Sequence, residues 1–145
     1  MWMDTKYQPG ELRVVAYNAQ GKAVVEKTLR TAEKPHAIEA TIDRTQLDAD
    51  GKDLAFITVR VVDKNGTLCP TATNKISVAV KGAGATYRAM ANGDPTCLEI
   101  FHEPAMSAFG GMLTAIVRSS ETGGNAEVSI FSKGLKPATI KITSK

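Results

Sequence analysis

Acidic residues gather at two places in this sequence of 145 residues, and each place suggests its own chemistry. Glu99 and Glu103, with Asp94 nearby, offer the two carboxylates that glycosidases use to cleave a sugar linkage. His102 and Phe101 lie in the same segment. A glycosidase also needs a cleft of substrate size, which a small domain rarely provides. We therefore interpret the segment as an acidic surface loop and assign no catalytic residue.

The second acidic cluster consists of Asp48, Asp50 and Asp53 around Gly51, and it resembles a calcium-binding loop. An EF-hand loop closes at its twelfth position with a glutamate that binds the ion. Counted from Asp48, that position holds Val59. We therefore predict turn-forming acids here and no calcium site.

Two further motifs begin like known sites and then fail. His102-Glu103 starts like the zinc-protease motif, but Met106 replaces the second histidine and Pro104 disfavours the required helix. Gly82-Ala83-Gly84 starts like a dinucleotide-binding loop, but Tyr87 replaces the third glycine. We expect neither a metal nor a cofactor.

Charge and hydropathy argue against two classes of partner. The formal net charge is +3 with scattered Lys and Arg, whereas a nucleic-acid surface usually carries a basic stripe. The longest apolar runs, Leu54–Val59 and Met112–Val117, have six residues each, and a membrane-spanning helix needs about twenty. Met1–Gly10 lacks the apolar stretch of a signal peptide, so an export signal would lie outside this segment. Cys69 and Cys97 are too few for a disulfide framework, and two partly buried free thiols are favoured over a single bridge, for which the fold would have to bring the two residues together.

Alternation of apolar and polar residues is the dominant pattern, and it is typical of strands with one buried face. In Leu54–Val62, the side chains of Ile57, Val59 and Val61 share one face. We predict further strands over 12–17, 23–29, 36–43, 75–81, 85–91, 112–118, 126–131 and 138–143. Residues 45–53 are polar, with room for one short helical turn, and 97–111 follow no pattern.

The strands after residue 36 predict an all-β fold, an immunoglobulin-like antiparallel β-sandwich preceded by a β-hairpin. The sandwich spans residues 36–145, and a polar stretch that ends in proline, residues 32–35, forms a linker before it. The predicted core consists of Ile57, Val59, Val61, Ile76, Val78, Val80, Leu113, Ala115, Val117, Val128, Ile130, Ile140 and Ile142.

A series of short motifs follows along almost the whole chain. They are Trp2-x-Asp4-x-x-Tyr7-x-Pro9-Gly10-Glu11-Leu12, Val14-Val15-Ala16-Tyr17, Asp43-Arg44, Asp48-Ala49-Asp50-Gly51, Val61-Val62-Asp63, Pro70-x-Ala72-x-Asn74, Asn92-Gly93-Asp94-Pro95, Ala115-Ile116-Val117-Arg118-Ser119 and Gly134-Leu135. In this order they resemble a C-terminal, invasin-like segment of glycoside hydrolase family 2 β-galactosidases from Bacteroides-like bacteria. The sequence departs from that pattern at Cys69, where an aliphatic residue is expected.

The resemblance implies an accessory role in carbohydrate metabolism. In such hydrolases the catalytic acids sit on a TIM barrel of roughly 250 residues, for which this chain has no room. No catalytic residue transfers to it, and it is not an enzyme alone. The resemblance implies a structural or positioning role against the other domains of the parent hydrolase, in the periplasm or at the cell surface.

Two other functions stay open. A carbohydrate-binding module, with weak carbohydrate contact, would need exposed aromatic side chains, and the sequence offers Trp2, Tyr7, Tyr17 and Tyr87. An invasin-like adhesion domain is the other alternative.

The resemblance also makes residues 1–31 the closing hairpin of a preceding β domain. A lone hairpin is marginal in water. We therefore expect it to dock on the sandwich through Leu12, Val14 and Val25, to fray, or to form a homodimer through its free edges.

Overall fold

The computed structural model describes residues 6–145, so Trp2 and Asp4 of the predicted motifs lie outside the described residues. Over this range the secondary structure consists of β-strands. No helix in residues 6–145 has the length and apolar character needed to cross a membrane. The chain divides into two compact units, Met1–Ala32 and Glu33–Lys145, which we call the hairpin unit and the sandwich unit.

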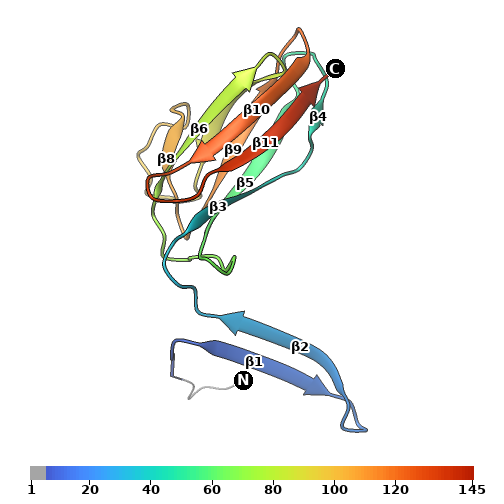
Figure 1. Cartoon of the computed structure of the whole chain (residues 1–145), viewed down its shortest axis with the longest axis vertical. Helices are drawn as coiled ribbons and strands as arrows, with labels where there is room; N and C mark the ends of the chain where they lie inside the picture. The colour runs from blue at the N-terminus through green and yellow to red at the C-terminus, as the bar shows by residue number, and fades with distance from the viewer. Residues whose placement is uncertain (1–5) are drawn as a thin grey trace. The chain divides into compact units, whose positions relative to one another are not determined.

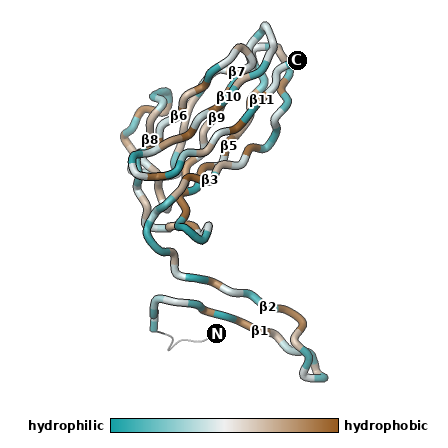
Figure 2. Tube along the Cα trace, viewed as in Figure 1, coloured by the Kyte–Doolittle hydropathy of each residue, from teal (hydrophilic) through white to brown (hydrophobic). Residues whose placement is uncertain are grey.

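The hairpin unit pairs β1 (Glu11–Tyr17) with β2 (Ala23–Arg30) in antiparallel fashion (Figure 1). This confirms both strands predicted there. Its two faces differ in character. Leu12 lies opposite Leu29 on one face, whereas the other face carries ion pairs between Arg13 and Glu26 and between Arg30 and Glu11. Figure 2 shows hydrophobic stretches along both strands.

The sandwich unit contains two sheets that overlie each other in Figure 1. One sheet has the strand order β4-β11-β10-β6-β8 and the other β3-β5-β9-β7. All pairs are antiparallel except β11 with β4. The all-β sandwich predicted from the alternation is therefore confirmed. The strands are β3 (Ala37–Ile42), β4 (Gln46–Leu47), β5 (Leu54–Val62), β6 (Lys75–Gly82), β7 (Ala85–Ala91), β8 (Ala105–Ser107), β9 (Met112–Ser119), β10 (Gly124–Phe131) and β11 (Ala138–Ser144).

The core lies between the two sheets and contains mostly aliphatic side chains. The predicted core residues are buried, except that Val80 and Ile140 are only half-buried. Met90 and Met106, which the prediction omitted, are fully buried. Methionine suits a position between two sheets because its unbranched, flexible side chain adapts to irregular space in a core.

Two short strands correct the sequence-based assignment. Residues 45–53 contain β4 instead of a helical turn, and the unassigned segment 97–111 contains β8. Strands of two and three residues are too short to show a period. They form because longer partners fix them: β11 pairs with β4, and β6 pairs with β8.

The Gly82-Ala83-Gly84 motif connects β6 in one sheet to β7 in the other. A side chain at Gly84 would place its Cβ 2.1 Å from the carbonyl oxygen of Gly124. The glycine is therefore required by the close approach of β10, and the motif serves as a connection between two strands.

Candidate functional site

Glu99 is the most engaged carboxylate of the acidic segment. It forms an ion pair with Lys75 of β6, and its Oε2 accepts a hydrogen bond of 2.6 Å from the backbone N–H of Ser107. The Ser107 hydroxyl donates to Oε1 at 3.1 Å. The Lys75 ammonium, followed by these hydrogen bonds, lowers the pKa of Glu99. Both oxygens therefore hold the loop to β6 and β8, which is a structural task.

The other acidic-segment residues do not converge on Glu99. Asp94 caps its own turn, with Oδ1 accepting from the N–H and the hydroxyl of Thr96 at 2.8 and 2.7 Å. Glu103 and His102 are exposed. The backbone carbonyl of Glu103 accepts a hydrogen bond from Tyr87 Oη at 2.6 Å. The arrangement provides loop anchors, and it does not bring two free carboxylates together.

An open groove of about 460 Å³ lies over β10 and β11. It is lined by Lys81, Asn125, Ala126, Glu127, Lys141, Ile142 and Thr143. None of the acids in the 94–103 segment reaches it. The groove therefore lacks the pair of carboxylates that glycoside hydrolysis requires.

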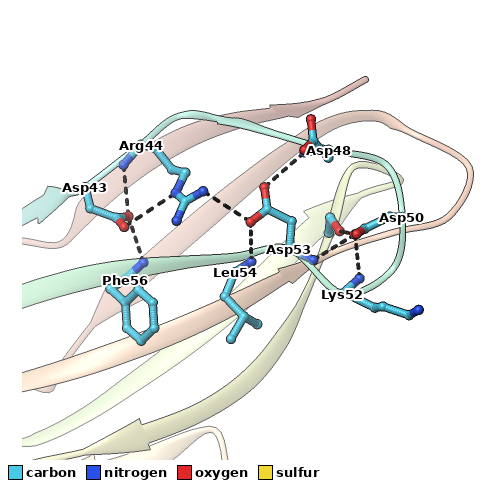
Figure 3. A network of polar contacts seen from close by, with 9 residues as sticks. Asp43, Arg44, Asp48, Asp50, Lys52, Asp53, Leu54 and Phe56 are labelled. Atoms are coloured by element: carbon cyan, nitrogen blue, oxygen red, sulfur yellow. Dashed lines mark hydrogen bonds and ion pairs between the residues drawn. The ribbon is translucent and has the colours of Figure 1, made fainter.

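The acidic turn before β5 is a hydrogen-bonding network (Figure 3). Asp53 accepts from the N–H of Asp48 at 3.0 Å and of Leu54 at 2.9 Å, and from Arg44 Nη1 at 3.2 Å. Because carboxylate oxygens that receive backbone N–H groups stabilise a turn, Asp53 fixes the entry into β5.

Asp50 plays a similar part in the same turn. Its Oδ1 accepts from the N–H of Lys52 and of Asp53, both at 2.8 Å, and from Ser119 Oγ at 3.3 Å. The backbone N–H of Lys52 is the main cause of its lowered pKa. Among residues 6–145, the His, Cys, Asp and Glu side chains form no group of three or more placed to hold a metal ion.

Asp63, at the end of β5, is a structural residue that the sequence-based list of sites omitted. It is buried, and its carboxylate accepts from the N–H of Glu33 at 2.9 Å, of Asn65 at 2.8 Å and of Thr67 at 2.9 Å. The N–H of Glu33 is the main cause of its lowered pKa. The Asp-x-Asn-Gly turn sequence predicts the hydrogen bonds from Asn65 and Thr67, which are close in sequence. It does not predict the bond from Glu33, which is 30 residues away.

The two cysteines are free, as predicted. Cys69 is buried, and its Sγ lies 3.5 Å from the carbonyl oxygen of Glu33. Burial is the main cause of its raised pKa, so this thiol is protonated near neutral pH. A buried, protonated thiol is a packing group and a poor nucleophile.

Residues 38–141 match the model of the glycoside hydrolase family 2 C-terminal domain 5. The chain belongs to this family. A β-galactosidase of Bacteroides ovatus is 39% identical over 140 residues, which cover 97% of this chain and 16% of that protein. The family resemblance inferred from the motifs is therefore confirmed.

Solved structures agree with this assignment to family 2. A glycosyl hydrolase family 2 member from Bacteroides cellulosilyticus superposes with a TM-score of 0.89 at 33% identity, covering 97% of this chain and 18% of that one. A β-glycosidase from Bacteroides vulgatus gives a TM-score of 0.85 at 26% identity, with 94% and 18% covered. The chain thus spans less than a fifth of the length of these three enzymes.

A carbohydrate-binding module could draw on four aromatic residues of the sequence, Trp2, Tyr7, Tyr17 and Tyr87. Trp2 lies outside the described residues, while Tyr7 and Tyr17 are exposed on the hairpin unit. Tyr87 is half-buried, and its hydroxyl is used by the loop after β7. The phenylalanines of the sandwich unit, which were not among the predicted candidates for sugar contact, are all exposed: Phe56, Phe101, Phe109 and Phe131.

Proposed function

We propose that this C-terminal domain is a non-catalytic accessory part of a family 2 β-galactosidase and that it packs against the other domains of its parent enzyme and stabilises them. The proposal rests on the lengths of the two matched proteins. Almost the whole chain aligns with the β-galactosidase from Bacteroides ovatus, but the aligned region is only 16% of that enzyme.

The geometry of the acids supports the same proposal. Glu99 is bound on both oxygens by Lys75 and Ser107, so it is not free to donate a proton or attack a sugar. Asp50, Asp53 and Asp63 accept backbone hydrogen bonds within turns. Each of these carboxylates maintains the fold.

The test compares the full-length parent enzyme, the enzyme lacking residues 33–145, and the isolated chain. A chromogenic β-galactoside reports activity, and the temperature of half-inactivation reports stability. We expect no turnover by the isolated chain above a buffer control. We expect the deletion to lower the half-inactivation temperature while the remaining enzyme still cleaves the substrate.

Glu99→Gln and Glu103→Gln in the isolated chain are the controls. Turnover that either substitution abolished would show a catalytic site in this domain and contradict the proposal. A deletion that leaves half-inactivation unchanged would contradict the stabilising role.

A weak carbohydrate contact is the second proposal, and the exposed phenylalanines favour it. Aromatic rings stack on the apolar faces of sugars, and Phe56 and Phe109 are 42% and 49% exposed. A glycan array probed with the chain beside the full-length enzyme tests this. Binding that Phe56→Ala or Phe109→Ala removes would support it, and an empty array would contradict it.

Two further proposals concern assembly and location. The hairpin unit exposes Leu12, Val14 and Val25, so we propose that the isolated chain forms a weak homodimer through this hairpin.

We also propose that the parent enzyme works in the periplasm or at the cell surface, which follows from the resemblance. Cell fractionation with an antibody against this domain tests the location, and a purely cytoplasmic signal would contradict it.

A further inference from the structure

The connection between β7 and β8 exposes three large apolar side chains within four residues. Leu98 is 97% exposed, Ile100 63% and Phe101 54%. We call these three residues the apolar tip. Single exposed apolar residues are common on protein surfaces, whereas a contiguous group of them marks an interaction site.

The backbone beneath the apolar tip is firmly held. The carbonyl oxygen of Phe101 accepts from the N–H of Met90 at 2.9 Å and from Tyr87 Oη at 3.1 Å. Both donors belong to β7, which is an edge strand of its sheet. The loop therefore covers a sheet edge that would otherwise be free to pair with another chain.

The other side of the loop is anchored as well. Glu99 lies between Leu98 and Ile100 and is bound by Lys75 and Ser107. The N–H of Glu103 donates to the carbonyl oxygen of Ile100 at 3.1 Å. These bonds hold the backbone of residues 99–103, and the apolar side chains of the tip are left facing water. Because the backbone of this loop is already ordered, little conformational entropy is lost when the apolar tip binds a partner.

We propose that the apolar tip docks on an apolar surface of another domain of the same polypeptide. This inference rests on the proposed accessory function and names the surface through which it works. The relatives supply the occupant, because more than four-fifths of the Bacteroides ovatus β-galactosidase lies outside the matched region, which is 16% of its length.

The chemistry of the tip favours a protein over a sugar. Leu98 and Ile100 are branched aliphatic side chains without a planar face for sugar stacking, and the neighbouring carboxylate of Glu99 is already bound. Protein interfaces, in contrast, bury apolar anchors in desolvated pockets.

The size of the tip favours a tethered domain over a second copy of the chain. A stable association between separate chains buries about 800 Å² on each partner, which is more than three side chains provide. A tether supplies an effective concentration near the millimolar range, so a small contact suffices within one polypeptide.

Hydroxyl-radical footprinting of the full-length enzyme tests the proposal. Phe101 and Phe131 form a matched pair, since both are phenylalanines of the sandwich unit with exposures of 54% and 45%. If the tip is docked, Phe101 should be labelled on the order of tenfold more slowly than Phe131, as a desolvated anchor would be. Met90 and Met106 are fully buried and should stay unoxidised, which reports that the domain is folded.

Leu98→Asp in the full-length enzyme should release the tip and raise the labelling of Phe101 to that of Phe131. Thr139→Asp adds the same charge at an exposed position on β11 and should leave Phe101 protected. Met90 and Met106 must remain protected in both variants.

Three results would overturn the inference. They are equal labelling of Phe101 and Phe131 in the unmodified enzyme, protection of Phe101 that appears only when an oligosaccharide is added, and protection that disappears on dilution. The deletion experiment separates this inference from the proposed function. An enzyme that loses stability without residues 33–145 but labels Phe101 freely would keep the accessory role and reject this surface.

Discussion

The carboxylate of Asp63 accepts a hydrogen bond from the backbone N–H of Glu33 at 2.9 Å, across 30 residues of sequence. Asp63 directly follows β5, and Glu33 is the first residue of the sandwich unit. The side chain of Glu33 also pairs with Lys64 at 3.1 Å. The start of the unit is therefore fastened to the turn after β5 by both its backbone and its side chain.

Asp63→Asn should lower the melting temperature of the chain by several degrees at pH 7. The pKa of Asp63 in the folded chain is lowered, so the unfolded chain binds more protons near pH 4. Its contribution to stability is thus fully present above the unfolded pKa of about 3.9 and is lost as the pH falls through the folded pKa. Melting curves from pH 7 to pH 2 should show the gap between wild type and Asp63→Asn closing at the acid end.

Glu103→Gln is the control for this titration, because Glu103 is an exposed acid whose side chain is not used in the loop. It should leave the melting temperature at pH 7 unchanged. A gap between wild type and Asp63→Asn that stays constant down to pH 2 would contradict the ionised role of Asp63.

Gly84→Ala should destabilise the sandwich unit by about 3 kcal/mol, the upper end of ordinary overpacking. The new Cβ would lie 2.1 Å from the carbonyl oxygen of Gly124, which is backbone and cannot rotate away. Gly66→Ala is the matched control. Its φ is +79° with no atom near the new Cβ, so only backbone strain of about 1–2 kcal/mol applies. Urea unfolding measures both, and equal losses would refute the steric argument.

Val59→Ala should cost on the order of 1–4 kcal/mol, through lost transfer energy and the cavity left behind. Val59 is 1% exposed on β5, in the centre of its sheet. Val80→Ala is the comparison, since Val80 is only half-buried and should cost less. The denaturation midpoint reports both values. An unmoved midpoint for Val59→Ala would mean that the core is assigned wrongly.

Tyr87→Phe should destabilise the β7–β8 connection by about 0.5–1.5 kcal/mol, the usual net value of a hydrogen bond. The hydroxyl donates to the carbonyl oxygens of Phe101 and Glu103. Hydrogen exchange should show faster exchange at Met90 and Glu103, whose amides bond within this connection, and unchanged exchange along β5. Faster exchange everywhere would indicate a global effect and would reject the local role.

Regular alternation of apolar and polar residues made the long strands predictable. The exposed apolar residues of the loop follow no such alternation and could not be predicted. β5 and β9 bury every second residue, so their faces could be read from the sequence. The apolar tip carries no period, because Leu98, Ile100 and Phe101 lie on a loop. Nothing in a single sequence distinguishes such residues from a short buried run.

The acids show the same limit. The turn-forming role of Asp50 and Asp53 was predictable from local residues, since most of their partners are near neighbours, whereas Asp48 takes part through its backbone N–H. The Glu99–Lys75 and Asp63–Glu33 contacts join residues that are far apart in sequence. Such contacts depend on the sheet topology, which alternation alone does not specify.

The hairpin unit gives the last prediction. Within residues 6–145, β1 and β2 pair only with each other, whereas β5 pairs with β3 on one side and β9 on the other. A two-stranded hairpin is marginal in water because it buries little apolar surface. Amides of residues 12–29 should therefore exchange faster than those of residues 54–62 in the isolated chain.

Protein concentration should change that difference if the hairpin forms the proposed homodimer. Free edges pair with other strands, and the face carrying Leu12 and Leu29 would then be covered. Exchange at residues 12–29 should slow as concentration rises, while exchange at residues 54–62 stays constant. Fast exchange that is independent of concentration would reject the dimer, since the hairpin would then fray alone. Equal protection of the two segments at every concentration would reject the idea of an independent hairpin, because a marginal two-stranded unit cannot be as stable as a central strand of the sandwich.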